Sequence, residues 1–264
     1  VPKYGAKEFL LEKHNGKFEP TTYNETKRRA LNIGAGLTAL GIERGDRISI
    51  LAEGVNNWII SELGLLYAGA ISVPLSIKLE EANDLTFRLK HSDAKLVFVS
   101  NHQLKKIRNI VAELPELKHV VVWGNVEGGL REGELSLAEI EARGEEYLKT
   151  NKDSFMAIGQ SLKNDDIATI TYTSGTTADP KGVVLTHRNY TANVEQALSV
   201  VSIPSTWRTL IILPLDHCFA HVVGFYIMIA CGASVATTQV GRTPMETLKN
   251  IPLNIKEVRP HFLL

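Results

Sequence analysis

Cysteine is scarce in this sequence. Cys218 and Cys231 are the two that are present among 264 residues, and their spacing fits neither a metal site nor a disulfide framework. This usage favours a reduced, cytoplasmic protein over a disulfide-bonded secreted one. The N-terminal segment also lacks the continuous apolar stretch of a signal peptide.

An excess of charge and a long apolar run are missing as well. The 29 basic and 29 acidic side chains cancel, so no overall field attracts nucleic acid, and we expect no nucleic-acid partner. The longest apolar stretch, Val222 to Cys231, is well short of the roughly 18 to 20 residues of a membrane span. We therefore expect a buried helix there and no transmembrane segment. Peripheral membrane contact and small-molecule chemistry stay open.

Apolar segments rich in β-branched residues alternate along the chain with segments of helical periodicity. The expected strands are 47–51, 70–75, 95–100, 119–123 and 167–172, and the expected helices are 23–40, 57–67, 104–114 and 187–200. Strands that are apolar on both faces and separated by helices indicate an α/β fold with a mostly parallel sheet and flanking helices.

The alternating pattern weakens between Gly124 and Asp166. One polar helix is expected there, over about 136–149, between Gly-rich and Asn/Asp-rich loops. We expect a boundary near the end of this region, which divides the chain into two subdomains, 1–165 and 166–264.

Two stretches of the chain share one plan. Residues 47–73 and 208–235 each consist of an expected strand, a loop, an apolar helix, a small residue followed by Gly-Ala, and a second strand. Two similar βαβ-type subdomains would produce this pattern. Chance would also produce it, because βαβ units commonly resemble one another.

The most informative segment is the loop from Thr173 to Gly182, TSGTTADPKG. It has four hydroxyl residues, two glycines and one lysine, and no large apolar side chain. Gly175 lets the backbone approach a ligand and turn its N–H groups outward, while the hydroxyl groups add further donors. Lys181, placed after the rigid Pro180, adds a positive charge. These features predict a cradle for a polyphosphate, outside regular secondary structure.

Two common nucleotide motifs are absent from this segment and from the rest of the chain. A Walker P-loop would need a Gly-Lys pair followed by Ser or Thr, whereas here Lys181 precedes Gly182. A Rossmann site would need G-x-G-x-x-G. Composition alone also leaves open a purely structural, solvent-exposed hairpin connection.

The loop resembles the signature of the adenylate-forming superfamily, which includes acyl-CoA synthetases, peptide-synthetase adenylation domains and beetle luciferases. That signature has two hydroxyl residues followed by G-T-T-G-x-P-K-G, and nine of its ten positions match here. Two further stretches agree: LYAGAISVPLS at 66–76 resembles the K-A-G-A-x-x-V-P-L segment, and LPLDHCFAH at 213–221 resembles the L-P-x-x-H-x-F segment of long-chain fatty acyl-CoA synthetases.

The resemblance implies a role for particular residues. The residues expected to line the ATP triphosphate are Thr173, Ser174, Gly175, Thr176, Thr177 and Lys181. Thr176 would lie near Mg²⁺, and His217 and Phe219 would lie where the acyl carboxylate meets the α-phosphate. Lys181 and His217 are the expected catalytic residues. Without the resemblance, His217 would be interpreted as a core histidine at a strand end and Phe219 as ordinary core.

The activity that the resemblance implies is ATP-dependent conversion of a carboxylic acid, most simply a fatty acid, to an acyl-adenylate, followed by transfer to coenzyme A. Adenylation of an aryl or amino acid is an alternative. A nucleotide-binding protein without synthetase activity is another, because Ala178 stands where the family usually has glycine. An unrelated α/β protein with a structural loop is the third.

The chain stops at RPHFLL, before the family's downstream G-Y-G-x-T-E segment. The resemblance therefore implies that residues 1–264 are an incomplete, truncated large N-terminal AMP-binding domain, without the small C-terminal domain and its catalytic lysine. We expect these 264 residues to be inactive by themselves.

Overall fold

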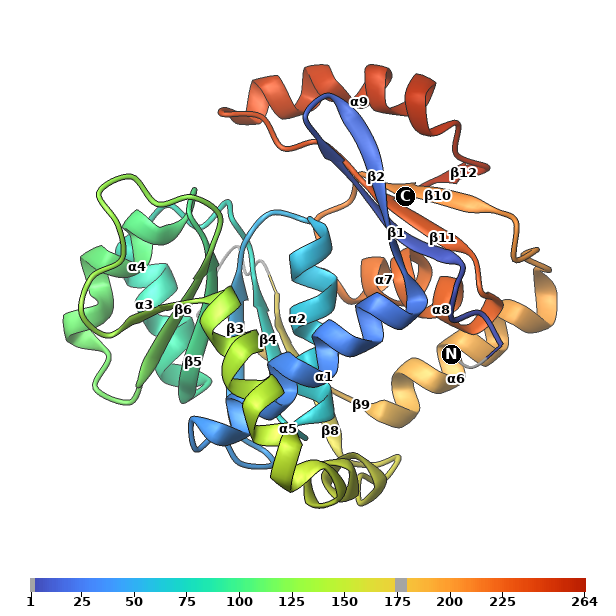
Figure 1. Ribbon diagram of the computed structural model, residues 1–264. Helices are drawn as coiled ribbons and strands as arrows, with labels where there is room; N and C mark the ends of the chain where they lie inside the picture. Colours follow the sequence, from blue (N-terminus) through green and yellow to red (C-terminus); the bar gives the residue numbers. More distant parts are fainter. Residues whose placement is uncertain (1–2, 174–179) are drawn as a thin grey trace. The chain divides into compact units, whose positions relative to one another are not determined.

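The computed structural model describes residues 3–173 and 180–264 (Figure 1). The chain folds into two compact units. One unit consists of Val1–Arg28, Glu53–Ile60 and Arg188–Leu264 and contains a five-stranded sheet; the other consists of Arg29–Ala52 and Ser61–His187 and contains a seven-stranded sheet. We call them the five-stranded unit and the seven-stranded unit.

The seven-stranded sheet is parallel except at one edge. Its strand order is β7-β6-β5-β3-β4-β8-β9, and only β9, which pairs with β8, runs antiparallel to its neighbour. The strands are β3 (Arg47–Leu51), β4 (Ile71–Leu75), β5 (Ala94–Ser100), β6 (His119–Trp123), β7 (Glu134–Ser136), β8 (Ile167–Tyr172) and β9 (Gly182–Thr186). The central strands β3, β4, β5 and β6 are buried over most of their length, which explains the continuous apolar runs in the sequence.

Helices cover both faces of this sheet (Figure 1). They are α3 (Ala82–His91), α4 (Leu104–Ile110) with the short 3₁₀ turn η1 (Val111–Glu113), and α5 (Leu137–Gln160), together with the later parts of α1 (Tyr23–Ala39) and α2 (Asn56–Tyr67). The leucines and isoleucines of α3 and α4 pack on one face against Val97, Val99, Val120 and Val122. This burial stabilises the sheet from which the predicted loop emerges.

On α1, α2 and α5, glycines allow a close approach between helices. A Cβ atom added at Gly144 of α5 would lie 1.7 Å from the carbonyl oxygen of Asn32 in α1, and one added at Gly36 would lie 2.2 Å from the carbonyl oxygen of Ile140. The Arg29–Glu141 ion pair, at 2.6 Å, links the same two helices. The backbones of α1 and α5 therefore pack so closely that positions 36 and 144 have room for the hydrogen atom of glycine but not for a methyl group.

The five-stranded sheet joins the two ends of the sequence. Its order is β12-β10-β11-β1-β2, in which β1 pairs parallel with β11 and antiparallel with β2. The strands are β1 (Glu8–His14), β2 (Lys17–Thr22), β10 (Arg208–Ile211), β11 (Ser234–Thr237) and β12 (Phe262–Leu263); the helices are α6 (His187–Val200), α7 (Cys218–His221), the π-helical turn η2 (Val222–Tyr226), α8 (Ile227–Cys231) and α9 (Pro244–Val258). Val258 of α9 packs with Leu11, Leu210 and Ala236.

The two units divide the chain differently from the boundary expected near residue 165. The first 28 residues belong with residues 188–264, because β1 forms a parallel ladder with β11. Residues 167–186 belong with the preceding part of the chain, because β8 pairs with β4 and β9 pairs with β8. Pairing over such separations leaves no local signal in the sequence.

The shared plan of residues 47–73 and 208–235 is confirmed. The first segment forms β3, α2 and β4, and the second forms β10, the α7–η2–α8 helix and β11, with parallel strand pairs in both. Gly69 and Gly232 end the helices at φ of +71° and +69°. In both, the next amide donates a 3.0 Å bond five residues back, from Ala70 to Leu65 and from Ala233 to Met228.

The apolar stretch from Val222 to Cys231 forms the η2 turn and α8, and Gly224, Phe225, Ile227 and Met228 within it are buried. The expectation of a buried helix is therefore confirmed. None of the described helices combines the length and apolar character that crossing a bilayer needs.

Candidate functional site

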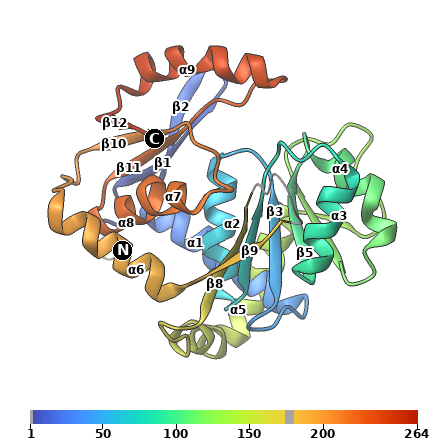
Figure 2. The ribbon, with the colours of Figure 1, turned by 180° about the vertical axis from the view of Figure 1, so that it is seen from behind.

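The predicted phosphate loop connects β8 and β9, which lie side by side in Figure 2. Tyr172 pairs with Gly182 across the hairpin, and the N–H of Thr173 donates a 3.0 Å bond to the carbonyl oxygen of Lys181. Gly182 is thus the first residue of β9 rather than the last loop residue. The side chains of Thr173 and Lys181 are both exposed. The structure therefore brings the two ends of the predicted loop together.

The other predicted loop residues, Ser174, Gly175, Thr176 and Thr177, lie outside the described residues, as does Ala178. Their assignment to ATP and Mg²⁺ stays a prediction. Within the described part of the chain, no group of three His, Cys, Asp or Glu side chains is arranged to hold a metal ion. The described donors at the loop, the Thr173 hydroxyl and the Lys181 ammonium, have the chemistry that suits phosphate oxygens.

The strand that leads into the loop is held by α3. The hydroxyl of Tyr172 lies 2.8 Å from Nδ1 of His91, and the Arg88 guanidinium lies 5.8 Å from the centre of the Tyr172 ring. Burial raises the pKa of the Tyr172 hydroxyl. These contacts fix the chain just before Thr173. These contacts could not be predicted from the sequence, because residue 91 and residue 172 are far apart and α3 was not expected.

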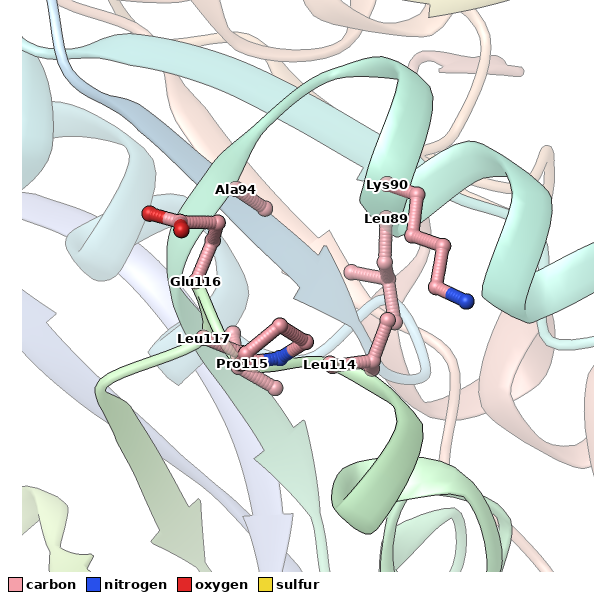
Figure 3. Close-up of a pocket in the computed structure, with 7 residues that line it drawn as sticks. All are labelled: Leu89, Lys90, Ala94, Leu114, Pro115, Glu116 and Leu117. Atoms are coloured by element: carbon pink, nitrogen blue, oxygen red, sulfur yellow. The ribbon is translucent and has the colours of Figure 1, made fainter.

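The loop emerges at the carboxyl edge of the parallel strands, where α/β sheets commonly bind ligands. A cavity of about 250 Å³ in the same unit lies at the opposite edge, where Ala94 begins β5. Figure 3 shows its seven lining residues: Leu89, Lys90, Ala94, Leu114, Pro115, Glu116 and Leu117. The lining is mostly apolar, and Glu116 pairs with Lys95 at 2.9 Å. This cavity is therefore not part of the phosphate site.

His217 and Phe219 lie together in the five-stranded unit, at the start of α7. Nδ1 of His217 accepts a 3.3 Å hydrogen bond from the N–H of Phe219, so His217 is the N-cap of the helix. The His217 side chain is exposed, and Phe219 is 52% exposed. The alternative interpretation of both residues as core is wrong. Lys181 belongs to the seven-stranded unit.

His221, four residues after His217, is a buried histidine that the sequence did not single out. Its Nε2 lies 2.8 Å from the carbonyl oxygen of Leu215, and its Nδ1 lies 3.4 Å from the Tyr190 hydroxyl. The rings of Trp58 and Phe225 lie 5.1 and 5.5 Å away. A carbonyl only accepts, so Nε2 carries the proton. Burial lowers the pKa of His221 to about 4, against the opposing effect of the Leu215 carbonyl.

The low pKa of His221 predicts acid sensitivity. An unfolded histidine binds a proton below about pH 6.5, whereas folded His221 stays neutral down to about pH 4. The unfolded state therefore gains protons first, and the free energy of unfolding should fall by about 2 to 3 kcal/mol as pH drops through this window. Urea denaturation between pH 7 and pH 4 measures it. The His221→Met variant should lose much of this dependence; an identical pH profile would contradict the assignment.

Comparison with known proteins agrees with the fold. The AMP-binding enzyme family matches residues 2–263. A chloroplastic long-chain-fatty-acid–[acyl-carrier-protein] ligase of Arabidopsis thaliana is 27% identical over 99% of this chain and 36% of its own length. A long-chain-fatty-acid–CoA ligase of Xenopus laevis is 25% identical over 98% of this chain and 35% of its own length. The chain thus spans about a third of these relatives.

Solved structures share the fold. An anthranilate CoA ligase in complex with anthranoyl-AMP has a TM-score of 0.82 and 23% identity, covering all of this chain and 47% of its own. A fatty acyl-adenylate ligase from L. pneumophila, in complex with acyl adenylate and pyrophosphate, has a TM-score of 0.73 and 23% identity, covering 97% of this chain and 41% of its own. The fold, the closed β8–β9 loop and the match over residues 2–263 lead to one conclusion: the chain belongs to the AMP-binding enzyme family.

Proposed function

We propose that the full-length protein activates a carboxylic acid, with a long-chain fatty acid as the favoured class, by forming an acyl-adenylate from ATP. The observation that carries the proposal is the closure of the β8–β9 loop. The Thr173–Lys181 backbone bond sets a hydroxyl and an ammonium group at the mouth of a loop with nine of the ten signature positions.

The proposed reaction has two steps. A carboxylate oxygen of the acid attacks the α-phosphorus of ATP, the bond to the bridging oxygen breaks, and pyrophosphate leaves with the bonding electrons. A thiol, having lost its proton to solvent, then attacks the acyl carbon through sulfur; a thioester forms, the bond between that carbon and the AMP oxygen breaks, and AMP leaves with the bonding electrons. Neither step needs a nucleophile from the protein. The chain contributes by positioning the two reactants and stabilising the charge that develops on the phosphoryl oxygens.

Individual residues take stated roles in this proposal. Lys181 and the hydroxyl groups of Thr173, Ser174, Thr176 and Thr177 bind the triphosphate, and Gly175 lets the backbone approach it. Thr176 would help to hold the Mg²⁺ ion, which when bound would neutralise phosphate charge. His217 and Phe219, exposed at the start of α7, face the acid carboxylate.

Support for a fatty acid comes from the names of the relatives, which include ligases for long-chain fatty acids. Structural neighbours named as anthranilate and benzoate CoA ligases make an aryl acid the second candidate. Coenzyme A is the proposed acceptor, and the acyl carrier protein named in one relative is the alternative. A cytoplasmic location stays a prediction, since named relatives are chloroplastic or peroxisomal.

ATP–pyrophosphate exchange tests the proposal, because it reports the first step alone. The full-length protein should exchange label from pyrophosphate into ATP only with Mg²⁺ and an acid, and fatty acids of long chain should exceed benzoate, anthranilate and amino acids. Coenzyme A or acyl carrier protein, added in parallel reactions, should then release AMP. No exchange with any acid would contradict the proposal and favour nucleotide binding alone.

The same assay applied to residues 1–264 by themselves should give no exchange. The chain spans 36% of the length of one relative and 47% of one structural neighbour, so we expect further transition-state contacts to come from elsewhere in the full-length protein. Each such contact commonly contributes about 2 to 4 kcal/mol. Strong acid-dependent exchange by these residues alone would contradict this expectation.

A further inference from the structure

The helix that carries His217 and Phe219 is tied to the preceding segment by a buried side chain. His221 ends α7 and is fully buried, and its Nε2–H donates a 2.8 Å hydrogen bond to the carbonyl oxygen of Leu215. This hydrogen bond links residue 215 to residue 221. It therefore restrains both ends of the segment between them, which contains His217 and Phe219.

Leu215 is itself firmly held. Its side chain is 2% exposed, and Cδ1 approaches Gly54 closely enough that a Cβ there would lie 3.4 Å away. Just before it, the N–H of Leu213 donates a 2.9 Å bond to the carbonyl oxygen of Leu264. The carbonyl group of Leu215 is held in addition by His221. His217 is only two residues further along, so its backbone position depends on Leu215.

A packing role alone does not account for a histidine at this position. A buried imidazole loses its hydration, as its lowered pKa reflects, and an apolar side chain would fill the same space without that cost. The ring uses both nitrogens, since Nδ1 faces the Tyr190 hydroxyl at 3.4 Å. The next five residues form a π-helical turn, Val222–Tyr226, a deviation that is frequent at functional sites.

We propose that His221 is a positioning residue for carboxylate activation, which holds the Leu215 carbonyl and thereby the segment that presents His217 and Phe219. This inference rests on the proposed function. His221 itself is buried and contacts no reactant. It acts through the backbone, and the expected result of its loss is a displaced His217 in a protein that still folds.

Two substitutions in the full-length protein separate the hydrogen bond from packing. His221→Gln keeps an amide donor at about the place of Nε2, whereas His221→Met has a similar volume and no donor. His221→Met should lower kcat for ATP–pyrophosphate exchange by about 10- to 100-fold, because a displacement of about 1 Å can have such an effect. The KM for ATP should stay within about twofold. His221→Gln should recover kcat to within about threefold of the unmodified protein.

A second measurement does not depend on activity. Residues 1–264 contain eight histidines, and the imidazole signals of His217 in a two-dimensional NMR spectrum of the full-length protein can be assigned by their loss in His217→Gln. These signals should shift in His221→Met and return in His221→Gln. If His221→Met does not fold, His221→Asn replaces it, since its shorter amide points toward Tyr190 and cannot reach Leu215.

The outcomes are distinct. Equal kcat in His221→Met and the unmodified protein, or unshifted His217 signals, would overturn the proposal; so would equal impairment of the Met and Gln variants. If the unmodified protein shows no exchange with any acid, the proposed function fails. The His217 signals then still decide whether His221 holds this segment.

Discussion

Lys181→Ala should slow acid-dependent ATP–pyrophosphate exchange in the full-length protein by about 100- to 1,000-fold. The Lys181 ammonium is exposed at the mouth of the β8–β9 loop, and its charge should interact with phosphate oxygens that become more negative as pyrophosphate leaves. The effect belongs to the transition state, so kcat should fall much more than the affinity for the carboxylic acid does. Exchange rates at saturating acid and ATP measure it.

Lys152→Ala is the matched control, because Lys152 is also an exposed lysine of the seven-stranded unit but lies on α5. Its exchange rate should equal that of the unmodified protein. Lys181→Arg keeps the charge and should retain part of the activity, although a guanidinium presents its donors differently. An unchanged rate in Lys181→Ala would remove this residue from the mechanism and leave the loop with a structural purpose.

The second large effect concerns stability. Gly144→Ala should lower the free energy of unfolding by about 3 kcal/mol or more, because the new methyl group would lie 1.7 Å from the carbonyl oxygen of Asn32 and must push α1 and α5 apart. Backbone atoms cannot move aside as a flexible side chain can. Urea or thermal denaturation of the purified variant measures the change.

Gly159→Ala provides the comparison on the same helix. Its nearest atom, the carbonyl oxygen of Tyr67, would lie 3.9 Å from the added Cβ, so nothing has to move. Alanine favours a helix over glycine, and stability should stay the same or rise by up to about 1 kcal/mol. If the two variants lose stability equally, the close approach of α1 and α5 at Gly144 is not what determines the effect.

Local patterns predicted the elements of the parallel sheet well. The expected strands at 47–51, 95–100, 119–123 and 167–172 are confirmed, since each is mostly apolar and rich in β-branched residues. The helix expected over 136–149 corresponds to the first part of α5, which continues past a kink at Asn151 to Gln160. The helix α3, whose residues are mostly polar, was not expected. Boundaries and polar helices depend on tertiary packing that a window of sequence does not contain.

The candidate site divides in the same way. The loop composition predicted Lys181 and Thr173 as neighbours of a phosphate, and the exposed side chains at the closed ends of the loop agree with that hypothesis. The supports of the site were not predictable. The contact of Tyr172 with His91 joins residues 81 positions apart. The bond from His221 to Leu215 becomes apparent only in the structure, where His221 is a buried histidine.

The parallel pairing of β1 with β11 has a consequence for synthesis on the ribosome. The carbonyl oxygen of Glu8 accepts a bond from the Ser234 hydroxyl, 226 positions later, so β1 can pair with β2 early but has to wait for these 226 positions before β11 is made. At about 5 to 20 residues per second, this delay lasts roughly 10 to 45 seconds. The strands of the seven-stranded unit all lie between residues 47 and 186, so they emerge during that interval. The nascent protein should therefore form its seven-stranded sheet first, while β1 and β2 are still exposed to chaperones and proteases.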